Sequence, residues 1–427
     1  MTPPNSDLKT PHLVSGLRCF VCGRTYPYGN LQTCPSCGPQ GILDVEYDYD
    51  AIAFHVTLNP FSSHPYDHWR YRALLPLPGG AKVPALQIGW TPVYPVPRLA
   101  TAVGIRELYL KDDGRNPTNS FKDRASSIGV LKAFEFGYDT VACASTGNAA
   151  SSLAGLSAAV GLQSVIFLPQ RAPEPKIAQL LVFGATVIRV RGTYERAFDL
   201  CREACKKFGW YNRNGGTNPF LVEGKKTAGL EIAEQLRTRL PDWVAVSVGD
   251  GCTIGAIGKG LQEMKTLRVI DRVPRLLGVQ AEGARPIVDA FRSGSDLVPV
   301  PTTTIADSIA VGTPRNWRRA INQVHMSQGD MVAVSDAEIL DAIRLTARLG
   351  AVFGEPAGVT GVAGLRKAVS LGIVRPGESA IAVITGNGLK DIASAKQAAG
   401  EPIDVDPNLS ALEAALASRT HPNRNPS

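Results

Sequence analysis

The sequence has 427 residues, 44% of them hydrophobic and 19% charged, with a formal net charge of +7 and a pI near 9.0. This length predicts two or more domains, and the lysines and arginines are too scattered to indicate a nucleic-acid partner. The start, MTPPNSDLKT, lacks the apolar core of a secretory signal, and no apolar run reaches transmembrane length, which favours a cytoplasmic protein without a membrane partner.

Two C-x-x-C pairs lie near the start of the chain, in LRCFVCGRTYPYGNLQTCPSCG, with eleven residues between them. Two such pairs can bring four thiolates to one tetrahedral ion. Disulfides would need an oxidising compartment, of which the sequence shows no sign, and a redox C-x-x-C usually occurs once. We therefore expect a flexible segment over 1–14 and a zinc-ribbon-like element over 15–48. Its structural Zn²⁺ would be held by Cys19, Cys22, Cys34 and Cys37.

The rest of the chain alternates short apolar runs with helical patterns, which predicts βαβ units, parallel sheets and helices on both faces, an α/β fold. The expected strands are 105–113, 141–146, 164–170, 186–192, 243–249, 275–283 and 379–386. The expected helices include 148–161, 176–184, 195–209, 227–240 and 409–418. The stretch NPFLVEGKKT precedes the fourth of these helices and is not assigned to it.

Three loops follow predicted strands directly, where ligands gather in open parallel sheets. They are STGNAASS (145–152), GDGCTIGAIGKG (249–260) and TGNGLKD (385–391). The second suits a phosphate, because Gly249, Gly251 and Gly255 allow close backbone approach at a helix N-terminus. It fits neither the dinucleotide fingerprint, whose third glycine is Ile254 here, nor the P-loop. Each loop taken alone also has a purely structural explanation, as a helix cap or a tight turn.

A lysine stands at the start of a predicted helix in NPTNSFKDRASSIG (116–129), where the helix dipole disfavours a cation. One explanation is an ion pair between Lys122 and Asp112, Asp113 or Asp123. The other is a neutral, nucleophilic amine that condenses with an aldehyde. With a phosphate loop and two polar loops at the same sheet edge, the second explanation predicts pyridoxal 5′-phosphate.

Together these motifs resemble the threonine synthase family of fold-type-II pyridoxal phosphate enzymes over residues of about 15–400. NSFKDR resembles the cofactor-lysine motif, which implies Lys122 as the Schiff-base lysine. The STGNAA loop implies that Asn148 contacts the cofactor ring and that the substrate carboxylate is held by Ser145, Thr146, Gly147 and Asn148. TGNGLKD implies Thr385 at the ring nitrogen. The phosphate loop would contribute Gly249, Asp250, Gly251, Cys252 and Thr253.

The resemblance also implies two αβα domains with the cofactor between them. The large domain would span 49–122 and 213–400, the small domain 123–212, and a tail 401–427. The implied reaction acts on a small amino-acid substrate. It is β,γ-elimination of phosphate from O-phosphohomoserine, followed by water addition to give L-threonine, in a homodimer.

Two departures from the family pattern leave other reactions open. NPFLVEGKKT differs from the family's NPFRxEGQKT, so that Leu221 replaces an arginine that faces the substrate phosphate and Lys225 replaces a glutamine. Lys225 would supply a cation, but without the planar fork of arginine. Asp250 and Cys252 replace asparagine and glycine in the phosphate loop, where a carboxylate repels phosphate unless it turns away. The alternatives are an ammonia-lyase or dehydratase, a β-replacement enzyme, and a non-catalytic zinc-ribbon protein.

Overall fold

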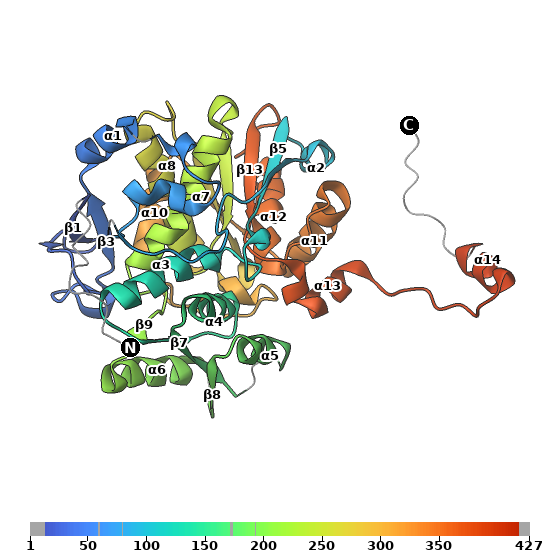
Figure 1. Cartoon of the computed structure of the whole chain (residues 1–427). Helices are drawn as coiled ribbons and strands as arrows, with labels where there is room; N and C mark the ends of the chain where they lie inside the picture. The colour runs from blue at the N-terminus through green and yellow to red at the C-terminus, as the bar shows by residue number, and fades with distance from the viewer. Residues whose placement is uncertain (1–12, 59, 79, 171–173, 193, 418–427) are drawn as a thin grey trace.

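The structure is a computed structural model that describes residues 13–417 except 59, 79, 171–173 and 193. The segment predicted to be flexible, 1–14, lies almost wholly outside the described residues. Three sheets and their helices make up the described part (Figure 1). Within it, no helix combines the length and the apolar character needed to cross a bilayer.

The N-terminal sheet is antiparallel and coincides with the predicted cysteine-rich element. Its order is β2-β1-β3, with β1 (Val14–Cys19), β2 (Thr25–Tyr26) and β3 (Leu43–Tyr47). Alternate residues of β3 are buried, as expected for a strand with one face on a core. The elements that follow on the way to the main body are α1 (Tyr49–Leu58) and the 3-10 helices Phe61–Ser63 and His68–Leu74.

The largest sheet has six strands in the order β12-β11-β10-β13-β5-β4, and all neighbours are parallel except β4 and β5. The strands are β4 (Val93–Pro95), β5 (Glu107–Asp112), β10 (Trp243–Ser247), β11 (Arg275–Ala281), β12 (Asp330–Val334) and β13 (Ser379–Ile384). Strands β4 and β12 were not predicted. Side chains of β10 alternate between two cores, Val244 and Val246 on one face and Trp243 and Ala245 on the other. That double burial explains its continuous apolar sequence.

Helices cover both faces of this sheet, as predicted. One apolar core joins the strands to residues of α3 (Lys122–Glu135), α7 (Phe220–Gln235), α8 (Cys252–Thr266), α9 (Pro286–Ser293) and α10 (Trp317–Met326). The core on the other face joins them to residues of α2 (Pro97–Val103), α11 (Asp336–Gly350), α12 (Pro356–Ser370) and α13 (Ile392–Ala399). The last helix, α14 (Leu409–Ala417), stands away from the body (Figure 1).

Helix α7 begins seven residues earlier than predicted, so most of NPFLVEGKKT is helical. Gly224 lowers helix propensity there, which hid the start of the helix from sequence reasoning. The structure gives a reason for this glycine, because a Cβ on Gly224 would lie 1.9 Å from the carbonyl oxygen of Arg124. Helices α3 and α7 therefore pack with almost no space between their backbones.

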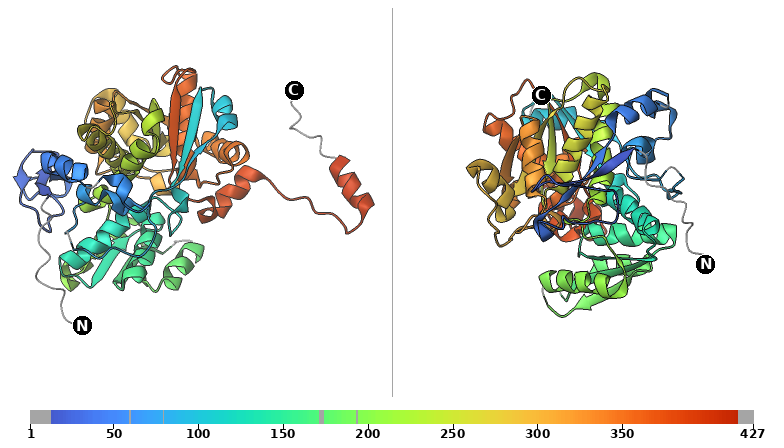
Figure 2. Two further views of the ribbon diagram at one scale, coloured as in Figure 1. Left: turned by 45° about the horizontal axis from the view of Figure 1, so that its top comes forward. Right: turned by 90° about the vertical axis from the view of Figure 1, so that its left-hand side faces the viewer.

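The third sheet is fully parallel, with the order β8-β7-β6-β9. Its strands are β6 (Thr140–Ala144), β7 (Gln163–Pro169), β8 (Thr186–Val190) and β9 (Tyr211–Asn212), and its helices are α4 (Asn148–Val160), α5 (Glu174–Val182) and α6 (Tyr194–Phe208). This sheet lies below the six-stranded one in Figure 1 and in both views of Figure 2. Its strands all fall within 123–212, where the small domain was predicted; the domain boundaries themselves stay a prediction.

Candidate active site

A cavity of about 730 Å³ is bordered by the loops that follow β6, β10 and β13, together with the start of α3. This size is typical of sites for small ligands. Every residue predicted for the cofactor and the substrate lines it: Lys122, Ser145, Thr146, Gly147, Asn148, Lys225, Gly249, Asp250, Gly251, Cys252, Thr253 and Thr385. The structure therefore brings the three loops and both lysines together. The role of each residue stays a proposal.

Lys122 is the first residue of α3, and its carboxylate neighbours are engaged elsewhere. The backbone N–H of Phe121 donates to the carbonyl of Thr385 at 2.9 Å, which joins the lysine segment to the loop after β13. Asp123 accepts from the backbone N–H of Thr118 at 2.6 Å. Asp113 instead accepts from the guanidinium of Arg124, at 2.6 Å. Asp112 accepts from the backbone N–H of Gly114 at 3.1 Å. The explanation of Lys122 as half of an ion pair with Asp112, Asp113 or Asp123 is therefore wrong.

The amine of Lys122 is shifted towards its neutral form. Burial lowers its pKa, the nearby cation of Lys225 lowers it further, and the resulting value is about 8. At neutral pH a useful fraction of the amine is then unprotonated. A neutral amine on a cavity wall is the form that attacks an aldehyde.

The loop after β10 forms a cup for an anion. Gly251 has a φ of +93°, and a Cβ there would lie 2.6 Å from the carbonyl oxygen of Asn316, so only glycine fits. Helix α8 starts at the next residue, Cys252, and presents its N-terminal N–H groups to the cavity. The hydroxyl of Ser247, at the end of β10, is buried without a hydrogen-bond partner among the described residues. Free donors of this kind suit a phosphate.

Asp250 lies in this cup, yet its carboxylate is held by the start of α10. It accepts from the backbone N–H of Arg315 at 2.7 Å and from the side-chain amide of Asn316 at 2.9 Å. The thiol of Cys252 donates to it at 3.0 Å. Because α10 holds this charge, the backbone N–H groups of the cup remain for an anion.

Asn148 has a partner that the sequence did not reveal. Its side-chain amide donates to Glu355 at 2.6 Å, and Glu355 precedes α12 and also lines the cavity. The backbone N–H of Glu355 donates to the carbonyl of Gly386 at 3.1 Å, beside Thr385. The only local signal was the Glu-Pro pair that opens a helix. The hydrogen bond to Glu355 orients the side chain of Asn148.

Two buried cations on the cavity wall have no ion-pair partner among the described residues. Arg213 is 3% exposed and donates to the hydroxyl of Ser126 at 3.0 Å, and Lys225 is 5% exposed. A Cβ built on Gly215 would lie 3.9 Å from Arg213 Nη1 and from Lys225 Nζ, so both cations approach one point. Burying unpaired charge is costly. The arrangement favours an anionic ligand. Sequence reasoning missed Arg213, as it missed the exposed Arg315 on the same cavity.

Leu221 does not line the cavity. It is fully buried in α7, and its Cδ2 lies 2.9 Å from the position of a Cβ on Gly129 of α3. Arg213 Cγ lies 3.6 Å from that same position. The expectation that residue 221 faces the substrate is therefore not met, and a neighbouring residue supplies an arginine.

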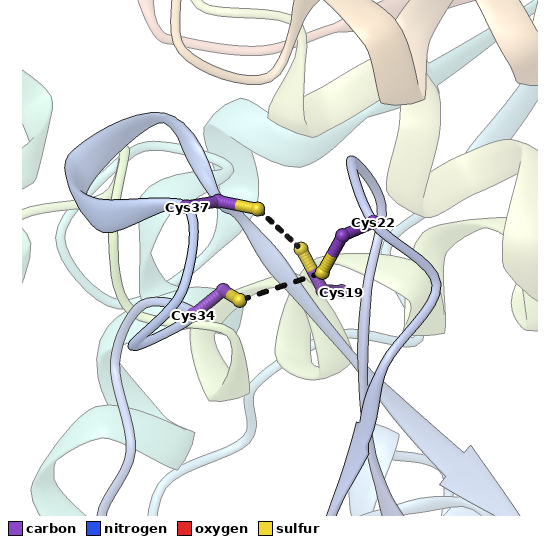
Figure 3. Close-up of side chains that lie close together, drawn as sticks. All are labelled: Cys19, Cys22, Cys34 and Cys37. Atoms are coloured by element: carbon purple, nitrogen blue, oxygen red, sulfur yellow. Dashed lines mark hydrogen bonds between the residues drawn. The ribbon is translucent and has the colours of Figure 1, made fainter.

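The four N-terminal cysteines form a cluster apart from this cavity (Figure 3). All four sulfur atoms lie within 4.8 Å of one another, with 4.0 Å between Cys19 and Cys37 and 3.7 Å between Cys22 and Cys34. Tetrahedral Zn–S bonds of about 2.3 Å would place the sulfurs about 3.8 Å apart. The donor set therefore fits a Zn²⁺ ion with a closed shell.

Comparisons with known proteins agree with this geometry. A family model described as pyridoxal-phosphate dependent enzyme matches residues 85–386. Threonine synthase of Methanocaldococcus jannaschii is 39% identical over 402 residues, 93% of this chain and 98% of that protein. Threonine synthase of Mycobacterium tuberculosis is 38% identical over 340 residues, which are 79% of this chain and 92% of that protein. The structure of maize serine racemase, 20% identical, aligns with a TM-score of 0.62 over 77% of this chain and 92% of that one, a likeness of fold alone.

Proposed function

We propose, from the premise that the chain belongs to the pyridoxal-phosphate dependent enzymes and within them to the threonine synthase family, that it converts O-phosphohomoserine to L-threonine. The observation that carries this proposal is the pair of buried, unpaired cations, Arg213 and Lys225, on the same cavity as Lys122. An amino acid with a phosphate group would neutralise them. The fold-type-II α/β fold and the cofactor predicted from the sequence are both confirmed by the family.

The cavity residues fit pyridoxal phosphate. When bound, the cofactor supplies an aldehyde for amines and a ring that delocalises negative charge. Lys122 would hold it covalently, while Ser247 and the N–H groups of 249–253 would take its phosphate. Asn148, oriented by Glu355, would meet the ring oxygen, and Thr385 would meet the ring nitrogen.

The chain's own groups then divide the work on the substrate. The loop 145–147, at the N-terminus of α4, binds the substrate carboxylate through its hydroxyl and N–H groups. Lys122 would take the Cα proton of the substrate, and its lowered pKa favours the neutral amine that this step needs. Arg213 and Lys225 hold the phosphate as it leaves and stabilise its growing charge.

The alternative reactions lose one of their supports. An ammonia-lyase or dehydratase was suggested by Leu221, whose side chain lies outside the cavity. An uncharged leaving group would leave the cofactor phosphate as the only anion offered to Arg213 and Lys225. A β-replacement enzyme that uses a phosphorylated amino acid would satisfy both cations equally well, and only its product differs.

A product assay tests the proposal. Purified protein would be given O-phosphohomoserine while phosphate, threonine and ammonia are followed together, with serine and threonine as comparison substrates. We expect phosphate and threonine in equal amounts, and neither from Lys122→Ala. Ammonia from serine or threonine, with little phosphate released, would establish the lyase instead.

We also propose that Cys19, Cys22, Cys34 and Cys37 hold one structural Zn²⁺ per chain, since the sulfur positions fit a closed tetrahedron. Elemental analysis of the purified protein should give one zinc per chain, and Cys34→Ser should lose it. A purified protein that contains no zinc while the thiols of these four cysteines are still free would count against the site. The cytoplasmic location and the homodimer stay predictions; sedimentation velocity would decide the second.

A further inference from the structure

Arg319 of α10 is anchored in the cysteine-rich element. It is 1% exposed; its Nη1 donates to Asp44 at 2.7 Å, and its Nη2 donates to the carbonyl of Leu43 at 2.7 Å. Its guanidinium carbon lies 4.4 Å from the centroid of the Phe20 ring. Phe20 stands inside the first C-x-x-C pair, between two of the proposed zinc ligands. The head of this side chain therefore rests on the zinc loop and on β3.

The stem of the same side chain lies against α8. A Cβ on Gly255 would lie 2.6 Å from Arg319 Cγ and 2.7 Å from its Cδ, so the glycine leaves room for the arginine. Gly255 is in the first turn of α8, which begins with the phosphate cup at Cys252. Arg319 thus fills the space between the cysteine-rich element and the helix that carries the cup.

One turn before Arg319, α10 holds the cup itself. Asn316 donates its backbone N–H to the carbonyl of Asp250 at 3.0 Å and its side-chain amide to the carboxylate of Asp250 at 2.9 Å. The backbone N–H of Arg315 adds a bond of 2.7 Å. These bonds keep the Asp250 charge at the helix start. A shift of α10 would free that charge to face an incoming phosphate.

A Zn²⁺ ion at the four cysteines would add to the order of the small cysteine-rich element. This element consists of three short strands, and a metal that binds only the folded form contributes its binding free energy to folding. If the zinc loop loosens, Phe20 no longer packs on the Arg319 guanidinium, and Asp44, which also pairs with Lys259 of α8 at 3.0 Å, would hold it less firmly. Its Nε already lacks a hydrogen-bond partner among the described residues, so few other contacts would keep the guanidinium in place.

From this chain of contacts we propose that Arg319 is a positioning residue that couples the cysteine-rich element to the phosphate cup. Zinc bound at the four cysteines then strengthens the binding of pyridoxal phosphate. The inference rests on the zinc site proposed above and is independent of the substrate. By linkage, the cofactor strengthens zinc binding by the same factor.

The test compares Arg319→Met with Arg318→Met, its neighbour on α10, which pairs with Asp296 at 2.9 Å on the surface. The apoenzyme of each is titrated with pyridoxal phosphate, with zinc present and after removal by a chelator, and folding is followed by circular dichroism. In the wild type and in Arg318→Met, we expect zinc removal to raise the cofactor Kd at least tenfold. In Arg319→Met the Kd should be raised already, and zinc removal should add less than threefold.

Two further measurements keep the proposal falsifiable if Arg319→Met or the zinc-free chain fails to fold. Asp250→Asn has no charge to release, so zinc removal should change its cofactor Kd less than threefold. Competition with a chromogenic chelator should show tighter zinc binding in the holoenzyme than in the apoenzyme. Equal zinc affinity in both forms would overturn the coupling. If elemental analysis finds no zinc, the zinc site fails, and an Arg319→Met cofactor Kd within twofold of wild type would overturn the positioning role as well.

Discussion

Two groups of buried cations in this protein differ in their partners. Arg124 is fully buried between α3 and α7, and it pairs with Asp113 at 2.6 Å and with Glu231 at 2.8 Å. Arg213 and Lys225, nearly as buried, have no carboxylate partner among the described residues. Burial works against the charge of Arg124, yet its two carboxylates raise its pKa, whereas burial lowers the pKa of Arg213. The buried cation with its own carboxylates stabilises the fold, and we propose that the two without a carboxylate are placed for a ligand.

The largest expected effect is at Lys122. Lys122→Ala should lower turnover about 10⁴-fold, because it removes the proton-transferring amine. The visible absorbance of the bound cofactor should disappear with it, while the free energy of unfolding stays near that of the wild type. Lys122→Arg is the matched control: it keeps a cation but cannot condense with an aldehyde, and it should be equally inactive. Turnover within tenfold of wild type in either variant would refute the assignment.

The second largest effect is expected at Arg124, the buried cation that pairs with carboxylates. Arg124→Met should lower the free energy of unfolding by about 3–5 kcal/mol, because it leaves Asp113 buried without its cation and Glu231 with Lys111 alone. Urea unfolding followed by circular dichroism measures this. Arg318→Met breaks an exposed pair and should cost less than about 1 kcal/mol. A loss below about 1 kcal/mol in Arg124→Met as well would remove the distinction between the two groups.

In contrast to Arg124→Met, Arg213→Met should lower activity without lowering stability. Losing charged hydrogen bonds worth about 1.5–3 kcal/mol should lower kcat/KM for the phosphorylated substrate by roughly 10–100-fold. Stability should hold or rise, since an unpaired buried charge is gone. Arg213→Lys keeps the charge without the planar fork, so its kcat/KM should lie between those of the wild type and Arg213→Met. Destabilisation as large as that of Arg124→Met would place Arg213 among the structural cations.

The smallest effect concerns pH. The rate at which the apoenzyme captures pyridoxal phosphate should rise with pH through about 8, as the Lys122 amine loses its proton. Burial lowers this pKa most, and the Lys225 cation lowers it further. Lys225→Met therefore raises the pKa, and the midpoint of the rate profile should move to higher pH by less than about one unit. A shift to lower pH would mean that the two amines do not interact as the structure indicates.

The sequence predicted the parts of the site that lie in local motifs. The loops 145–152, 249–260 and 385–391 follow buried strands, and parallel strands bring such loops to one edge of a sheet. Glu355, Ser247 and Arg213 are different, because each is a single residue whose approach to the cavity depends on how distant elements pack. The orientation of Leu221 has the same origin. The sequence shows that a leucine at position 221 departs from the family pattern. Only the contact between α3 and α7 shows which way its side chain points.

For the fold, too, the sequence predicted what local patterns specify and missed what depends on packing between distant elements. Apolar runs predicted most strands of the two parallel sheets, whereas β12, with the sequence DMVAV, starts with a charge, and β4, with the sequence VYP, has only three residues. The early start of α7 was concealed by Gly224, whose presence is explained by a backbone contact between two helices. Local signals thus indicated which elements exist, and the close approaches between them determined the exceptions.

The bonds of Asp44 also bear on how the chain is made. This residue leaves the ribosome early, but its partners Lys259 and Arg319 follow 215 and 275 residues later. At synthesis rates of about 5–20 residues per second, that interval is on the order of ten to sixty seconds. During this time the N-terminal sheet of the nascent chain lacks both of these cations, and the Zn²⁺ that we propose at its four cysteines would help to hold it. The supply of zinc during translation would then determine whether the N-terminal sheet is already folded when α10 leaves the ribosome and packs against it.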